Sequence, residues 1–102
     1  MELIRGTTPT IIFSFDTIQA ANISVAVLCV KQSKSTVIEK ELSDGLVSEG
    51  KLLFTLSQED TLKLNPSLVA KIILDWKTSA GVRGRSNIVE ATVTNPGKEE
   101  VL

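Results

Sequence analysis

The chain has 102 residues, of which 42% are hydrophobic and 23% are charged, and its formal net charge is −1. This length suits one domain around a single core, and this composition excludes general disorder. The 11 basic and 12 acidic residues are spread along the chain. The sequence therefore offers neither the basic patch that binds nucleic acid nor a polybasic membrane-binding segment.

The sequence carries no recognisable membrane or export segment. Its longest apolar run, residues 25–30, is far too short to span a bilayer. The opening residues, MELIRGTTPT, lack the apolar core of a signal peptide, so we expect a cytoplasmic product. The single cysteine, Cys29, has no partner for an internal disulfide, so packing alone must hold the fold.

The first third of the chain predicts two strands. Residues 1–8 are short and polar, and we expect them to dock loosely or to form an arm. Residues 10–15 (TIIFSF) alternate as a strand does, and Pro9 suits the position before it. After a polar connection at 16–22, residues 23–31 (ISVAVLCVK) are apolar on both faces, which is typical of a central strand or of a covered one.

The middle of the chain predicts further strands and one helical turn. Strands are expected at residues 36–42 and 51–56, with turns at 32–35 and 43–45 and at most a short strand at 46–48. Residues 57–62 (SQEDTL) no longer show the alternation of polar and apolar residues that is typical of a strand. Ser57 is a good N-cap, and Asp60 supplies the acid of a capping box, so a single helical turn should begin here.

Residues 68–77 (LVAKIILDWK) predict the strand around which the fold is organised. Leu68, Ala70, Ile72, Leu74 and Trp76 lie on one face, and Val69, Lys71, Ile73, Asp75 and Lys77 lie on the other. The first face is wholly apolar and bears the only tryptophan, so a second layer should cover it. A hairpin loop is expected at 78–81, followed by a returning strand over 82–93 that is irregular at Gly84.

These elements predict an all-β fold: an immunoglobulin-like antiparallel β-sandwich of about seven strands with one short helical turn. One domain should span residues 1–94, with a flexible tail at 95–102. The chain has one cysteine and no tyrosine. It therefore lacks the disulfide and the tyrosine corner of a true immunoglobulin domain.

The residues offer no sign of catalysis, and we expect no enzyme, no cofactor and no metal site. There is no histidine to act as a general base or a zinc ligand. Cys29 lies among apolar neighbours and should be an inert buried thiol. Two pairs of neighbouring acids, Glu39 with Glu41 and Glu59 with Asp60, fit a solvated strand face and a helix cap better than acid–base work or Ca²⁺ ligation.

Two other features have a plain and a functional interpretation. Arg83 and Arg85 could clamp a phosphate or carboxylate, but such a pair more often guards a sheet edge. Trp76 could stack on a sugar, but its place on the apolar face favours core packing.

The outward sheet face is the candidate interaction site. If the strands at 23–31 and 68–77 are neighbours, their outward side chains would form an exposed apolar patch with charged residues at its rim. The candidate interface residues are Leu28, Val30, Val69, Lys71, Ile73, Arg83 and Arg85. The alternative is that the N-terminal arm or the C-terminal tail covers the patch.

The order of TTPTIIFSF, a valine-rich strand, VIEKEL, KLLFTLSQEDTLKL and AKIILDW resembles small tail and baseplate-type proteins of phages and prophages of Gram-positive bacteria. The N-terminal immunoglobulin-like domain of phage upper baseplate proteins is the most similar. The resemblance covers residues 6–94, with Pro9-Thr10, Phe13 and the run 57–61 at its motif positions. Those proteins continue into a long coiled or receptor-side region, whereas this sequence ends at Leu102. We therefore expect a small virion or assembly component here.

This resemblance implies a non-enzymatic structural component of a phage or prophage particle, in its tail or baseplate. Its partners would be other phage structural proteins and further copies of itself, with no nucleic acid and no membrane. It would be made in the bacterial cytoplasm and reside in the virion. The alternatives are a carbohydrate-binding sandwich that uses Trp76, or an adaptor domain of a bacterial surface machine.

Overall fold

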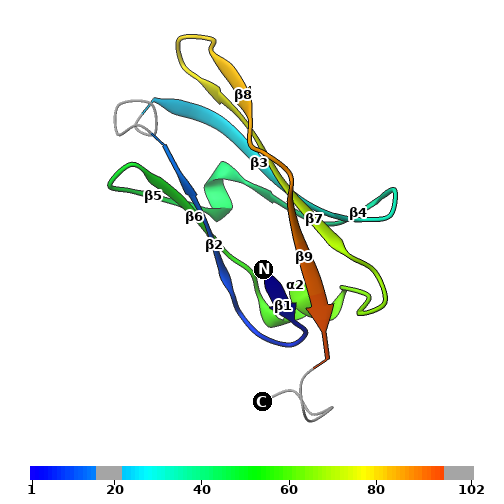
Figure 1. The fold of residues 1–102 in the computed structure, drawn as a ribbon. Coiled ribbons are helices and arrows are strands. Elements are labelled where there is room, and N and C mark those ends of the chain that lie inside the picture. The colour runs from blue at the N-terminus through cyan, green and yellow to red at the C-terminus, as the bar shows by residue number, and fades with distance from the viewer. Residues whose placement is uncertain (16–21, 96–102) are drawn as a thin grey trace.

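The computed structural model describes residues 1–15 and 22–95, which form two β-sheets packed face to face (Figure 1). The 6-stranded sheet has the order β1 (Glu2–Ile4), β9 (Val89–Thr94), β7 (Ala70–Thr78), β3 (Ile23–Gln32) and β4 (Ser35–Glu41), and β8 (Arg83–Arg85) also pairs with β7. The 3-stranded sheet has the order β2 (Thr10–Ser14), β6 (Lys51–Thr55) and β5 (Leu46–Ser48). The predicted all-β sandwich is confirmed.

Strand β7 is the centre of the large sheet, as its pattern predicts. It pairs with β3 on one side, and with β8 and β9 on the other. Ala70, Ile72 and Leu74 are buried on the face that meets the small sheet. There they join Leu52 and Phe54 of β6 in one hydrophobic core.

The structure corrects the predicted outer face of β3. Leu28 lies opposite Leu74, and Val30 lies opposite Ile72, so both point into the core, where their exposed fraction is 0%. Residues opposite each other in a sheet share a face, so the register with β7 decides which side of β3 is inward. Leu28 and Val30 are therefore not interface residues.

The N-terminal segment is also better anchored than predicted. β1 pairs with β9 in parallel, and Leu3 is buried at 1% exposure. Beyond β1, the Gly6 N–H donates to Oγ1 of Thr61 at 3.0 Å, and that hydroxyl donates to the Thr7 carbonyl at 2.8 Å. One apolar side chain and these bonds make the segment part of the sandwich.

The predicted helical turn is present as α2 (Gln58–Leu62), and a 3₁₀ turn, η1 (Leu42–Asp44), precedes β5. The Ser57 hydroxyl accepts the Asp60 N–H at 3.0 Å, and the Asp60 carboxylate accepts the Ser57 N–H at 2.8 Å. Lys40 of β4 approaches the same carboxylate at 2.9 Å. The capping box therefore forms as expected, and an ion pair ties it to the large sheet.

Trp76 is partly buried against the core, as its position predicts. Its ring meets Phe15 edge-on, with centroids 5.5 Å apart and planes at 87°. It also lies against Gly84 on β8, directly across the strand pair. These contacts identify Trp76 as a packing residue.

Two predictions fall mostly outside the described residues. These are the polar connection at 16–22 and the tail at 95–102, of which residues 22 and 95 alone are described. Asn95 accepts a hydrogen bond from Arg5 at 2.9 Å. The predicted tail therefore begins beside β1, and its flexibility stays a prediction.

Candidate functional site: the outer face of the large sheet

The outer face of the large sheet carries a solvent-facing apolar stripe. The stripe consists of Val25, Val27 and Cys29 on β3 and Ile73 on β7. Val25 is 51% exposed, and the other three are partly buried. These side chains alternate with the buried set of the same strands, so the apolar outer side of β3 remains at the surface.

Like charges lie opposite each other at both ends of this stripe. At one end Lys77 of β7 faces Arg83 of β8. At the other end Lys31 of β3 faces Lys71 of β7. Like charges directly opposite on one sheet face are destabilising, so the fold carries a cost where Lys77 meets Arg83. At the other end Glu90 of β9 lies opposite Lys71 on its second side and offsets the cost there. A partner with acidic groups would relieve the cost at Lys77 and Arg83 on binding.

Arg85 differs from Arg83 because it has an acidic partner. Its Nε donates to Oδ1 of Asp75 at 2.6 Å, and a nitrogen of its guanidinium end reaches Oδ2 at 3.4 Å. These hydrogen bonds and the Asp75 charge raise the pKa of Arg85. The Asp75 carboxylate is thus already engaged, which leaves the charges of Lys77 and Arg83 to face solvent.

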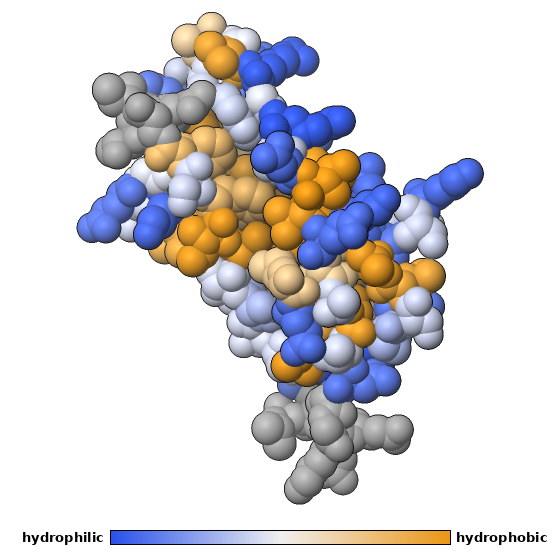
Figure 2. Space-filling view, in the orientation of Figure 1, coloured by the Kyte–Doolittle hydropathy of each residue, from blue (hydrophilic) through white to orange (hydrophobic). Residues whose placement is uncertain are grey.

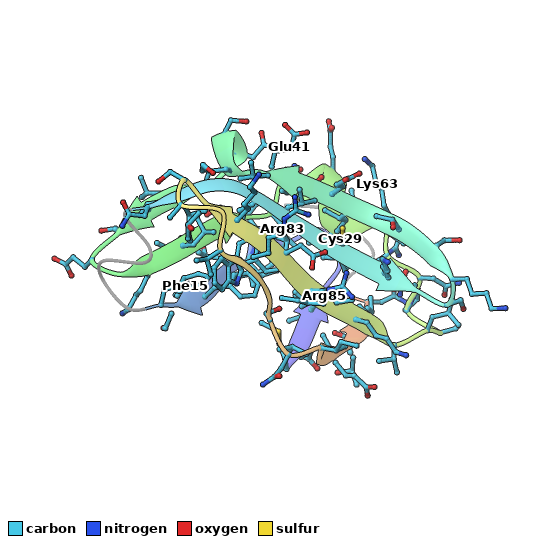
Figure 3. All side chains as sticks on the ribbon, turned by 90° about the horizontal axis from the view of Figure 1, so that it is seen from above. Phe15, Cys29, Glu41, Lys63, Arg83 and Arg85 are labelled. Atoms are coloured by element: carbon cyan, nitrogen blue, oxygen red, sulfur yellow. The ribbon has the colours of Figure 1, made fainter. Side chains whose placement is uncertain are left out.

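A shallow hollow of about 490 Å³ lies at the Lys77 end of the stripe. Its apolar walls come from Val25 and Val27, and its charged lining comes from Lys77, Arg83, Arg85 and Asp75. Figure 3 shows the labelled Arg83, Arg85 and Cys29 together over the large sheet. The hollow suits a contact that combines apolar and acidic groups.

Cys29 lies in the middle of the stripe and is less enclosed than predicted, with intermediate exposure. Its burial raises the pKa of the thiol, as do Glu39 and Asp75, while Lys31 and Arg85 oppose the rise. The raised pKa keeps the sulfur protonated, and a protonated thiol is a poor nucleophile. The predicted inertness thus has a physical basis, although Cys29 is partly accessible.

The structure places four of the predicted interface residues on this outer face: Lys71, Ile73, Arg83 and Arg85. Val69 is 47% exposed just before β7. Sequence reasoning missed Val25, Val27 and Lys77. The signal for Lys77 was present, because it shares the period-2 face of Ile73 and Asp75.

The described residues hold neither a cluster of metal-ligating side chains nor a membrane-spanning helix. Within residues 1–15 and 22–95, no three acidic or cysteine side chains converge as metal ligands would. Over the same part of the chain, no helix has the length and hydrophobicity to cross a membrane.

Comparison with known proteins bears on the fold. No protein-family model and no curated protein matches the chain. Among solved structures, the immunoglobulin-like domain of mouse leukocyte-associated immunoglobulin-like receptor 1, crystallised as a strand-swapped dimer, is similar at a TM-score of 0.52 and 15% identity, over 91% of this chain and 85% of that one. The fold is therefore an immunoglobulin-like β-sandwich.

Proposed function

We propose that this chain is a non-enzymatic structural component of a phage or prophage particle, in its tail or baseplate, and that it docks on neighbouring virion proteins through the outer face of its large sheet. The observation that carries the docking role is the solvent-facing apolar stripe with the like-charged pair Lys77 and Arg83 at one end. The phage assignment is supported by the sequence resemblance over residues 6–94.

The chemistry of the stripe defines the kind of partner surface. Val25, Val27 and Ile73 offer an apolar contact area, which is typical of the centre of an interface. Asp75 and Glu41 lie opposite Val27 on the two neighbouring strands. Lys77 and Arg83 at one end favour a partner that presents carboxylates. The partner we propose is a virion protein with an apolar centre and acidic groups beside it.

Binding to co-expressed partners tests the docking role. The chain is produced together with the structural proteins encoded beside it, and complexes are measured with Ile73→Glu and Lys77→Glu variants. A charge in the stripe, or a reversed charge at its end, should weaken binding at least about tenfold.

The matched control is Val47→Glu, which alters a 42% exposed valine on β5 of the other sheet. It should bind as the unchanged protein does. If Ile73→Glu and Lys77→Glu bind as tightly as Val47→Glu and the unchanged protein, the docking face is rejected. The phage assignment has its own test, because mass spectrometry of purified particles should detect the chain, and particles that lack it would refute a virion role.

A further inference from the structure

The free edge of β2 is a second surface with distinctive chemistry. Within the described residues β2 pairs with β6 alone. The Pro9 carbonyl accepts the Leu56 N–H at 2.9 Å, and the Phe15 N–H donates to the Gly50 carbonyl at 2.8 Å. In an antiparallel pair such bonds occur at every second residue. The main-chain N–H and C=O groups of Thr10, Ile12 and Ser14 therefore point away from β6.

An apolar hollow lies along this edge, in the seam between the two sheets. Its volume is about 380 Å³, and its lining includes Met1, Ile12, Phe13 and Val89. Met1 is 61% exposed, Ile12 is 53% exposed and Val89 is 41% exposed. Figure 2 shows apolar side chains along this side of the molecule, between β2 and β9. Exposed apolar side chains thus line the seam at the edge of the hydrophobic core.

Strand β2 lacks the protection that edge strands usually carry. Its five residues, TIIFS, include no charge. By contrast, the edge strand β4 carries Glu39, Lys40 and Glu41, and the edge strand β1 carries Glu2. The edge strand β5 is also uncharged, but it is only three residues long, and a very short edge strand is itself a protection against pairing. Charges on an edge discourage pairing with another strand. Their absence on β2, beside an apolar hollow, favours pairing.

We propose that a second copy of this chain occupies the seam, with the two β2 strands paired antiparallel about a two-fold axis. Ile12 of one copy lies opposite Ile12 of the other, and Thr10 lies opposite Ser14. Each outward N–H of one β2 then meets a C=O of the other β2. Such a contact, in which both copies use the same surface, is isologous. The pairing joins the two small sheets into one sheet and covers both seams. It does not depend on the proposed docking of the outer face.

The chemistry of the edge supports a second copy as the occupant. Outward N–H and C=O groups need an extended backbone beside them, and another β2 supplies it. Ile12 side chains that lie opposite each other bury apolar area on both copies, with no charge to desolvate.

Concentration-dependent mass measurement tests this dimer. Light scattering and sedimentation should show a dimer of the unchanged protein that dissociates on dilution. Ile12→Glu places two like charges opposite each other and should raise the dissociation constant at least about 100-fold. Leu46→Glu is the matched control, since Ile12, Leu53 and Leu46 form one cross-strand row and Leu46 is 63% exposed at the far edge.

Cross-linking gives a second readout that does not need a charged variant to fold. In a Cys29→Ser background, Ile12→Cys should form a disulfide between copies under mild oxidation, because opposite residues in a hydrogen-bonded pair have Cα atoms about 5.5 Å apart. Leu46→Cys should not. A strict monomer at the highest attainable concentration would overturn the proposal. So would a dimer that survives Ile12→Glu and is broken by Ile73→Glu.

Discussion

Gly84 and Trp76 depend on each other across the β7–β8 pair. A methyl group on Gly84 would overlap Cζ2 of the indole ring. We predict that Gly84→Ala destabilises the protein by about 1–3 kcal/mol, because overpacking must displace the ring. Urea denaturation monitored by tryptophan fluorescence measures both the loss and any red shift of the native emission. Unchanged stability with unchanged emission would show that the ring does not need this glycine.

The Asp60 carboxylate makes stability depend on pH. Burial raises the pKa of Asp60. Hydrogen bonds from Lys40 and from the Ser57 N–H and hydroxyl, together with the Lys40 charge, lower this pKa by more than burial raises it, so the pKa is below the usual value. A carboxylate with a lowered pKa stabilises the folded state at pH above its unfolded value of about 4, and the stabilisation is lost as pH falls through the lower folded value.

Asp60→Asn should therefore be less stable than the unchanged protein at neutral pH. The difference in unfolding free energy should shrink as the pH is lowered from about 6 towards 3. Denaturation at a series of pH values measures this difference. A gap that stays constant over that range would mean that the charge of Asp60 is not what stabilises the turn.

At the scale of elements, Gln32 at the end of β3 holds the connection that leads from α2 into β7. Its side chain is buried at 4% exposure. Nε2 donates to the carbonyls of Asn65 and Leu68 at 2.8 and 3.0 Å, and Oε1 accepts the Asn65 N–H at 2.8 Å. One side chain thus satisfies three main-chain groups of a connection that has no sheet partner of its own.

We predict that Gln32→Ala costs about 2 kcal/mol or more, because buried polar groups lose their partners. Thermal and urea unfolding measure this cost. Lys34→Ala, two residues along in the exposed hairpin turn, is the control and should change stability little. A Gln32→Ala protein as stable as the control would show that water replaces these bonds fully.

The local elements were predictable because local chemistry determines them. Ser57 and Asp60 identified α2, and alternation identified β7. The face of β3 was not predictable, because Val25, Val27 and Leu28 are all apolar and only the register with β7 separates them. In general, a strand that is apolar on both sides gives no local signal for which side is inward.

The same limit explains what sequence reasoning found and missed at the candidate site. Ile73, Arg83 and Arg85 were predicted because β7 has clearly different faces. Val25 and Val27 were missed because the outward patch was assigned to Leu28 and Val30, on the opposite face of β3. The anchoring of β1 was missed because a three-residue strand with one buried leucine, Leu3, gives too short a pattern.

At the scale of the whole molecule, the two proposed contact surfaces are separate. The outer face of the large sheet and the free edge of β2 lie on different sheets. A dimer formed through β2 would leave both outer faces available, so one assembly could present two copies of the docking surface. Avidity from two linked surfaces would strengthen attachment without any new contact.

The most direct test of the docking surface uses its own cysteine, since Cys29 lies in the stripe and the chain has no other. Alkylation of Cys29 is measured in the free protein, in intact particles, and in particles after denaturation. The account predicts slow but measurable labelling of the free protein, strong protection in the intact particle, and full labelling after denaturation. Equal labelling rates in the free protein and the intact particle would contradict it.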